Sequence, residues 1–224
     1  MLITIRSASR FTHPQKLRVG MCGLAALCAA LGGFTACSSP GKENIEVYGV
    51  QFSRAKIDGR GFVIGYLAGD STIAGRACKQ GWVHLHPNGV PAGFTAASDI
   101  VLSRFIIPSN TWVFQNEEGT VTQCAFPRDT GVQGQVCRGG GILGGAEGVQ
   151  TAFYPDGALK QFFARKPVRI DGVPCGNSLF QAGIELHENG RLRSATLSED
   201  YVRQGRVYHR GERMHLTPEG LPGG

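Results

Sequence analysis

A glycine recurs along most of this chain at the end of the same short pattern, and this recurrence limits the possible folds more than any other feature. Before each glycine, apolar and polar residues alternate and are followed by two turn-forming residues. The five turn glycines are separated by 30, 38, 33 and 30 residues: Gly89, Gly119, Gly157, Gly190 and Gly220. Alternation with a period of two is typical of a β-strand with one buried face. Repetition of the whole pattern indicates copies of one structural unit.

The residues around the turn glycines predict hairpins. Asn88-Gly89, Asp156-Gly157 and Asn189-Gly190 are pairs typical of hairpin turns in which both residues take positive φ. Apolar residues stand two, five and seven places after the glycine, as at Leu192, Ala195 and Leu197. The change from an even to an odd spacing between the residues two and five places after the glycine predicts a β-bulge there.

These patterns predict an all-β protein of about five repeated antiparallel hairpin or meander units, arranged as an elongated repeat sheet or as a solenoid. With 33 glycines in 224 residues, the glycine content is about twice the usual 7% and suits many tight turns. No segment after residue 36 shows helical periodicity. The repeat domain is expected over residues 48–224, with units near 48–81, 82–111, 112–148, 149–180 and 181–224.

Residues 1–36 have the layout of a secretory signal peptide, because a basic segment reaching Arg18 precedes an apolar run over 21–36. The junction Thr35-Ala36-Cys37 resembles a bacterial lipoprotein signal. The resemblance implies that Cys37 is acylated, that residues 37–47 form a tether, and that the protein is exported to the cell envelope. We expect an outer-membrane anchor, with the protein facing the periplasm or the surface. In the alternative reading, cleavage follows Gly32 and Cys37 is an incidental thiol.

The formal charge of +6 does not predict a nucleic-acid partner. Residues 1–36 hold four basic residues and no acidic one, which leaves 19 basic and 17 acidic residues after them. The body is therefore nearly neutral and has no basic stripe with interleaved aromatics. Arginines are dense near the C-terminus, and they are the candidate contact surface for an anionic protein or glycan: Arg191, Arg193, Arg203, Arg206 and Arg210.

The repeat pattern, best seen in FYPDGALKQF (153–162), resembles the MORN-variant repeats that also occur in some bacterial antitoxin-type proteins. The units here are longer than MORN units and lack the YxG signature. The resemblance implies an elongated β-meander used for binding or scaffolding, and it implies no reaction.

Four cysteines follow Cys37, and an even number in an exported protein suggests disulfides: Cys78, Cys124, Cys137 and Cys175. Cys124 and Cys137 flank one turn symmetrically, and sister units hold apolar pairs at the same two places. We therefore predict that Cys124 and Cys137 form a cross-strand disulfide. A bridge from Cys137 to Cys175, or four buried thiols, are the alternatives.

No feature of the sequence predicts catalysis, a metal or a cofactor. His84, His86, His187 and His215 recur at two places of the unit, but a metal site needs three or four converging ligands. Asp99, Asp129 and Asp200 recur at one turn, which is typical of turn-forming residues. The sequence contains no GxSxG, HExxH or phosphate loop. We expect a non-catalytic structural or protein- or glycan-binding module of the envelope. The alternatives are an antitoxin- or immunity-like inhibitor and an enzyme with a site on the repeat surface.

Overall fold

The computed structural model describes residues 45–140 and 148–223. The predicted signal peptide, Cys37 and most of the predicted tether lie outside these residues. The described part is all-β, as predicted, and its strands pair antiparallel. The predicted tether is too long at its C-terminal end, because Ile45–Val47 already form strand β1. Val47 belongs to the hydrophobic core, which draws this segment into the fold.

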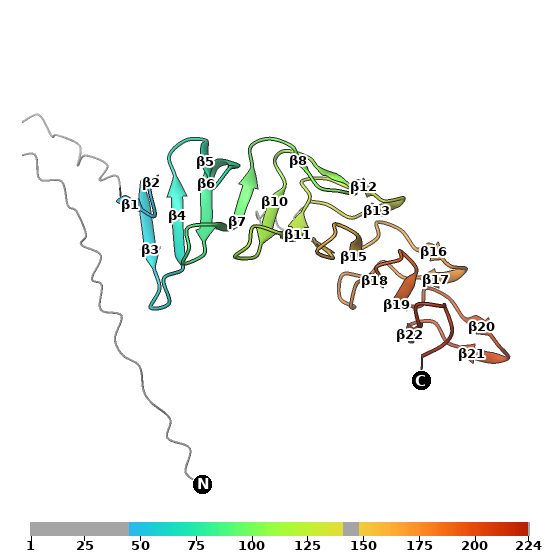
Figure 1. Cartoon of the computed structure of the whole chain (residues 1–224). Coiled ribbons are helices and arrows are strands. Elements are labelled where there is room, and N and C mark those ends of the chain that lie inside the picture. Colours follow the sequence, from blue (N-terminus) through green and yellow to red (C-terminus); the bar gives the residue numbers. More distant parts are fainter. Residues whose placement is uncertain (1–44, 141–147, 224) are drawn as a thin grey trace, which may run out of the picture. The chain divides into compact units, whose positions relative to one another are not determined.

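A twelve-stranded antiparallel sheet runs through the described chain. Its strands lie side by side in sequence order, so the sheet is a meander (Figure 1). The strands are β3 (Arg54–Ile57), β4 (Val63–Leu67), β6 (Arg76–Leu85), β7 (Pro91–Ala96), β10 (Trp112–Gln115), β11 (Val121–Ala125), β14 (Gln150–Phe153), β15 (Leu159–Phe162), β18 (Ile184–Leu186), β19 (Leu192–Thr196) and β22 (Arg213–His215), with β5 (Ser71–Ile73) paired to β6 only. We call the pairs β3–β4, β6–β7, β10–β11, β14–β15 and β18–β19 major hairpins.

Short hairpins precede, separate and follow the major hairpins along the chain, and we call these minor hairpins. They are β1 with β2 (Val50–Phe52), β5 with the start of β6, β8 (Ile100–Val101) with β9 (Ile106–Ile107), β12 (Thr130–Val132) with β13 (Gln135–Cys137), β16 (Val168–Ile170) with β17 (Val173–Cys175), and β20 (Tyr201–Arg203) with β21 (Arg206–Tyr208). One major and one minor hairpin together make the repeating unit.

The tip of a minor hairpin hydrogen-bonds to the turn of a later major hairpin. Gln133 Nε2 donates to the Gly157 carbonyl at 2.8 Å. The Leu192 amide donates to Asp171 Oδ2 at the same distance, 2.8 Å. Residues of the minor hairpins and of the sheet belong to one hydrophobic cluster. The minor hairpins therefore cover one face of the sheet, and the core lies beneath them.

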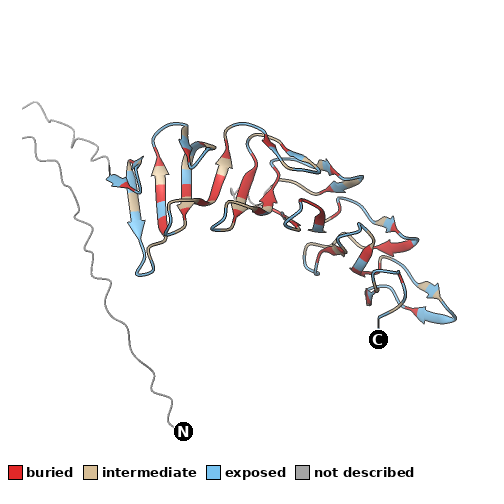
Figure 2. Cartoon of the chain, viewed as in Figure 1, coloured by how far each residue is buried: buried red, intermediate tan, exposed pale blue. Residues whose placement is uncertain are grey.

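Buried and exposed residues alternate along the strands (Figure 2). The apolar pairs that flank the second turn of each unit are all buried: Phe94 and Ile107, Cys124 and Cys137, Phe162 and Cys175, Ala195 and Tyr208. One member of each pair comes from the large sheet and the other from a minor hairpin or its end. These pairs therefore contribute to the core from both layers.

The structure confirms the predicted bulge. His84 pairs with Gly93 and Leu85 pairs with Pro91, so Ala92, three residues after Gly89, has no partner. The same register shift occurs in the three following major hairpins. A bulge adds one residue to the strand and reverses its alternation, which explains the parity change in the sequence.

Of the two positive φ angles predicted for each major turn, the structure has only the one at glycine. Gly89, Gly157 and Gly190 have positive φ, but the residues before them do not. Asn88 Oδ1 instead accepts the Val90 amide at 3.0 Å, an Asx turn that holds Asn88 in ordinary backbone conformation. Two consecutive positive φ angles occur at the tips of minor hairpins, as at Gln133 (49°) and Gly134 (82°).

Candidate binding surface

One face of the sheet is not covered by the minor hairpins, and we call it the open face. Along β6, Val83 and Leu85 are fully buried in the core, whereas the alternate residues Trp82 and His84 point to the open face. Strand pairing shows which residues of the neighbouring strands point to the same face. Phe114 of β10 and His84 of β6 both stand opposite Gly93 of β7, so all three lie on the open face. Half of the residues of each sheet strand thus belong to a surface outside the main core.

Aromatic and basic side chains meet at the start of the open face. Tyr66 stands opposite Trp82, and their ring centroids are 5.4 Å apart with the planes at 90°. The Arg54 guanidinium lies 5.0 Å from the Tyr66 ring centroid and 4.8 Å from that of Trp82, which are cation–π distances. Trp82 is 45% exposed. An arginine and two rings are therefore held together on solvent-accessible sheet.

A second aromatic group surrounds Gly93. Trp112 makes edge contacts with His84 and Phe114, with centroids 5.7 and 6.0 Å apart. A Cβ at Gly93 would lie 3.3 Å from Trp112 Cζ2 and 3.4 Å from His84 Nδ1, so a larger residue would push the rings apart. Trp112 is only 4% exposed. These rings form a small packed cluster that covers a glycine, and we assign it a structural role.

The open face becomes polar beyond β10. The row that contains His84 continues through residues on successive strands: Gln123, Ala152, Gln161, Glu185, Ser194 and His215. Arg213 Nη2 donates to Glu185 Oε1 at 3.0 Å and to Ser194 Oγ at 2.6 Å. Arg193 Nε lies 3.9 Å from the other Glu185 oxygen. One carboxylate is thus shared by two guanidinium groups.

The arginines of the predicted contact surface are largely engaged within the protein. Arg191 Nη1 donates to the Glu219 carbonyl at 2.7 Å, and Arg203 donates to the Gly220 carbonyl. Arg206 lies 3.7 Å from Glu212 and its Cζ is 4.7 Å from the Tyr208 ring centroid. Exposed ion pairs of this kind contribute little stability and leave the cations accessible to another anion. The side chain of Arg210 is exposed.

The recurrent histidines and aspartates link parts of the repeat. His86 Nε2 lies 2.9 Å from the Gln115 carbonyl oxygen, and His187 makes the equivalent contact. Asp99 and Asp200 accept backbone N–H groups ten residues on, at 2.8 and 2.7 Å, and so close the base of a minor hairpin. Asp129 does the same. These aspartates are structural, as predicted, although their partners lie across a hairpin rather than within one turn. Among residues 45–140 and 148–223, no group of His, Cys, Asp and Glu side chains is placed to hold a metal ion.

The four described cysteines are buried free thiols, so the predicted disulfide is absent from the structure. Cys124 stands in β11 opposite Val113 and Thr151. Cys137 pairs instead with Thr130 and bridges to Ala164. The two cysteines do not stand opposite each other on paired strands, because the chain between them leaves the large sheet and starts a minor hairpin.

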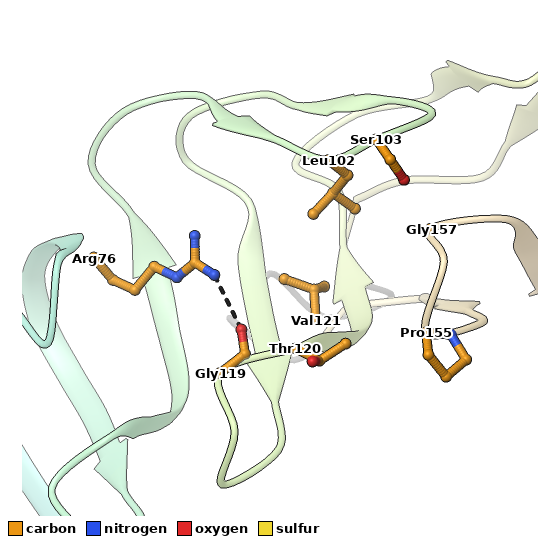
Figure 3. Close-up of a pocket in the computed structure, with 8 residues that line it drawn as sticks. All are labelled: Arg76, Leu102, Ser103, Gly119, Thr120, Val121, Pro155 and Gly157. Atoms are coloured by element: carbon orange, nitrogen blue, oxygen red, sulfur yellow. Dashed lines mark hydrogen bonds between the residues drawn. The ribbon is translucent and has the colours of Figure 1, made fainter.

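A pocket of about 230 Å³ lies where two minor hairpin tips reach the turns of β10–β11 and β14–β15 (Figure 3). Its lining includes Arg76, Ser103 and Gly119. Arg76 Nη2 donates to the Gly119 carbonyl at 3.0 Å, and Ser103 Oγ donates to the Asp156 carbonyl at 2.5 Å. Both polar side chains thus hydrogen-bond one hairpin to another, and we interpret the pocket as a packing gap between these hairpins.

No protein-family model, curated protein or solved structure matches this chain. The described residues form no helix with the length and hydropathy required to cross a bilayer. The density of arginines near the C-terminus predicted a contact surface there, but no sequence pattern predicted the group formed by Arg54, Tyr66 and Trp82. One signal was visible, because Trp82 and Trp112 both stand seven residues before a turn glycine, at an outward-facing place. Arg54 and Tyr66 carry no comparable repeat signal.

Proposed function

We propose that this chain is a non-catalytic lipoprotein of the cell envelope, and that the open face of its repeat sheet binds a protein or glycan partner. The observation that supports this proposal most is that only one face of the sheet is covered. The minor hairpins cover one face, and the other face presents side chains from successive hairpins in rows. Repeat proteins commonly use such continuous surfaces for binding. The resemblance to MORN-variant repeats supports the same class of role.

The polar part of the open face suits hydrogen-bonded recognition. Gln123 and Gln161 each carry an amide that both donates and accepts. They lie on β11 and β15, which flank β14, so two strand spacings of about 4.8 Å separate them. Glu185 is paired with Arg193 and Arg213, and a carboxylate held by two guanidinium groups favours docking over acid–base chemistry. Among the arginines of the predicted contact surface, Arg193 lies next to this cluster. We place the partner on β11 to β22 of the open face.

Site-specific photo-crosslinking in cells tests the binding surface. A photoreactive amino acid at His215, which is exposed and in the open-face row, should give an adduct with an envelope component. The matched position is Val202, which is 64% exposed but lies on a minor hairpin. Arg193→Ala should reduce the His215 adduct. Adducts from Val202 with none from His215 would place the partner on the other face and contradict the proposal.

The lipid anchor needs a separate measurement. A palmitate analogue should label the wild-type protein and leave Cys37→Ala unlabelled. Equal labelling of both proteins, or a mature N-terminus elsewhere, would rule out acylation at Cys37.

A further inference from the structure

The first three strands of the open face differ in chemistry from the rest. We call the group Arg54, Lys56, Ile64, Tyr66 and Trp82 the aromatic end, and strand pairing places all five on β3, β4 and β6. Ile64 is 46% exposed and Trp82 is 45% exposed, although both lie in the middle of strands. The corresponding places from β11 onward hold mainly polar residues, as at Gln123, Gln161 and Glu185. The exposed apolar surface is therefore confined to one end of this face.

The charges of the aromatic end have one sign. Arg54 and Lys56 are cationic, and none of the five residues is acidic. The carboxylate nearest in the chain, Asp58, accepts the backbone amides of Arg60 and Phe62 at 2.9 and 3.0 Å and so serves its own turn. Tryptophan, tyrosine and an aliphatic residue beside lysine and arginine are the combination found at the membrane–water interface. The rings occupy the headgroup region, and the cations bind anionic phosphates.

The position of the aromatic end in the chain also favours contact with a membrane surface. β3 is the edge strand of the large sheet, and the chain reaches it directly from β1 and β2. From Cys37 to Ile45 is eight residues, which span at most about 29 Å when fully extended. If Cys37 carries lipid, this end of the sheet stays close to a membrane surface. The opposite edge strand, β22, is ten strand-to-strand steps away.

We infer that the aromatic end docks on an anionic phospholipid surface, and this inference rests on the proposed lipid anchor. Ile64, Tyr66 and Trp82 would enter the interface, while Arg54 and Lys56 would contact lipid phosphates. The acyl chains supply the attachment, and the docked sheet end supplies orientation. The polar part of the open face, from β11 onward, lies at least three strand-to-strand steps from β6 and is left for the partner.

Vesicle binding of the protein without its lipid tests the inference, since residues 41–224 form one compact unit. The probes are vesicles of phosphatidylethanolamine with phosphatidylglycerol and vesicles of phosphatidylcholine alone. The chain has two tryptophans, Trp82 exposed and Trp112 buried, so a blue shift of emission reports mainly on Trp82. We expect sedimentation and a blue shift with the anionic vesicles, both weaker with phosphatidylcholine and in high salt.

Two double variants separate the apolar from the charged contribution. Ile64→Ser with Trp82→Ala should weaken vesicle binding roughly tenfold or more by removing exposed apolar surface. Arg54→Gln with Lys56→Gln should weaken it roughly tenfold at low salt and abolish the preference for anionic lipid. Val202→Ser, which removes a still more exposed aliphatic side chain from a minor hairpin, should bind as the wild type does. Circular dichroism confirms that each variant is folded.

Several results would overturn the inference. They are absence of sedimentation with anionic vesicles, or an equal loss of binding in Val202→Ser. Dimerisation that the Ile64 and Trp82 double variant abolishes would assign the surface to a second copy. A blue shift on adding soluble glycan strands without vesicles would assign it to a saccharide. Acyl labelling of Cys37 is scored independently, so failure of the anchor and failure of the docking surface are distinguishable.

Discussion

The Nε2 atom of His187 lies 2.9 Å from the carbonyl oxygen of Leu216, which links one repeat to the next. His86 makes the same contact with Gln115, and the Tyr154 hydroxyl donates to the Leu186 carbonyl, both at 2.9 Å. Each donor stands three residues before a turn glycine, and each acceptor stands four residues before the following one. The units of His86, Tyr154 and His187 thus use the same place for a side chain that contacts the next unit.

This equivalence predicts how substitutions at His187 rank. His187→Phe keeps a ring but removes the donor, and it should lower the free energy of unfolding by about 1 kcal/mol. His187→Tyr should retain most of that stability, because tyrosine already makes the contact at residue 154. Urea unfolding followed by circular dichroism measures both. Equal stabilities of the two variants would show that the contact does not stabilise the fold.

Gly190 should be intolerant of any side chain because of its backbone conformation alone. Its φ is +80°, and an added Cβ would meet no atom within 4 Å. Gly190→Ala should therefore cost about 1 kcal/mol of stability from left-handed backbone strain. Gly131 is the matched control, since it also has open space for a Cβ but does not have positive φ. Gly131→Ala should leave the melting temperature nearly unchanged, and similar losses in both variants would contradict the explanation.

The aspartate that closes the last minor hairpin should make stability depend on pH. The hydrogen bond from the Arg210 amide holds the pKa of Asp200 below its usual range, with help from nearby His209. A lowered pKa in the folded state means that the contribution is present above the unfolded-state pKa, about 3.9. It is lost as the pH falls through the folded-state pKa. Asp200→Ala should therefore lower the melting temperature at pH 7, and the difference from wild type should shrink in strong acid.

Glu188→Ala is the control for this measurement, because Glu188 is an exposed carboxylate in the turn between β18 and β19. Glu188→Ala should change the melting temperature little. A difference for Asp200→Ala that stays constant down to pH 2 would contradict the assigned role of its carboxylate.

The buried cysteines should react slowly in the folded protein. Burial raises the pKa of Cys78 and Cys137 to about 12 and that of Cys175 to about 11, and it also raises the pKa of Cys124. Because the thiolate is the nucleophile, alkylation at pH 8 should be at least about a hundredfold slower than for an exposed thiol. All four should be labelled after denaturation without reductant, as mass spectrometry would show. Cys124 and Cys137 both unlabelled there would instead reveal the disulfide.

Features that depend on residues close together in the chain could be predicted from the sequence. The turn at Gly190 needs positive φ at one residue, and the bulge after it follows from the spacing of Leu192 and Ala195. Both are local, so alternation and glycine spacing were sufficient to predict an all-β repeat sheet. The turn conformation at Asn88 was mispredicted, because its side chain offers the backbone a hydrogen bond that competes with the expected turn.

Which strands pair and which side chains meet in the core depends on contacts between residues far apart in the chain. Cys124 and Cys137 are separated by one turn, yet they belong to different sheets, because the minor hairpin folds back over the core. Arg54, Tyr66 and Trp82 come together only because β3, β4 and β6 pair in one register. A shift of one residue in that register would send Trp82 to the core face. Such contacts depend on long-range pairing, whose energy comes from burying the whole core and cannot be read from any single segment of the chain.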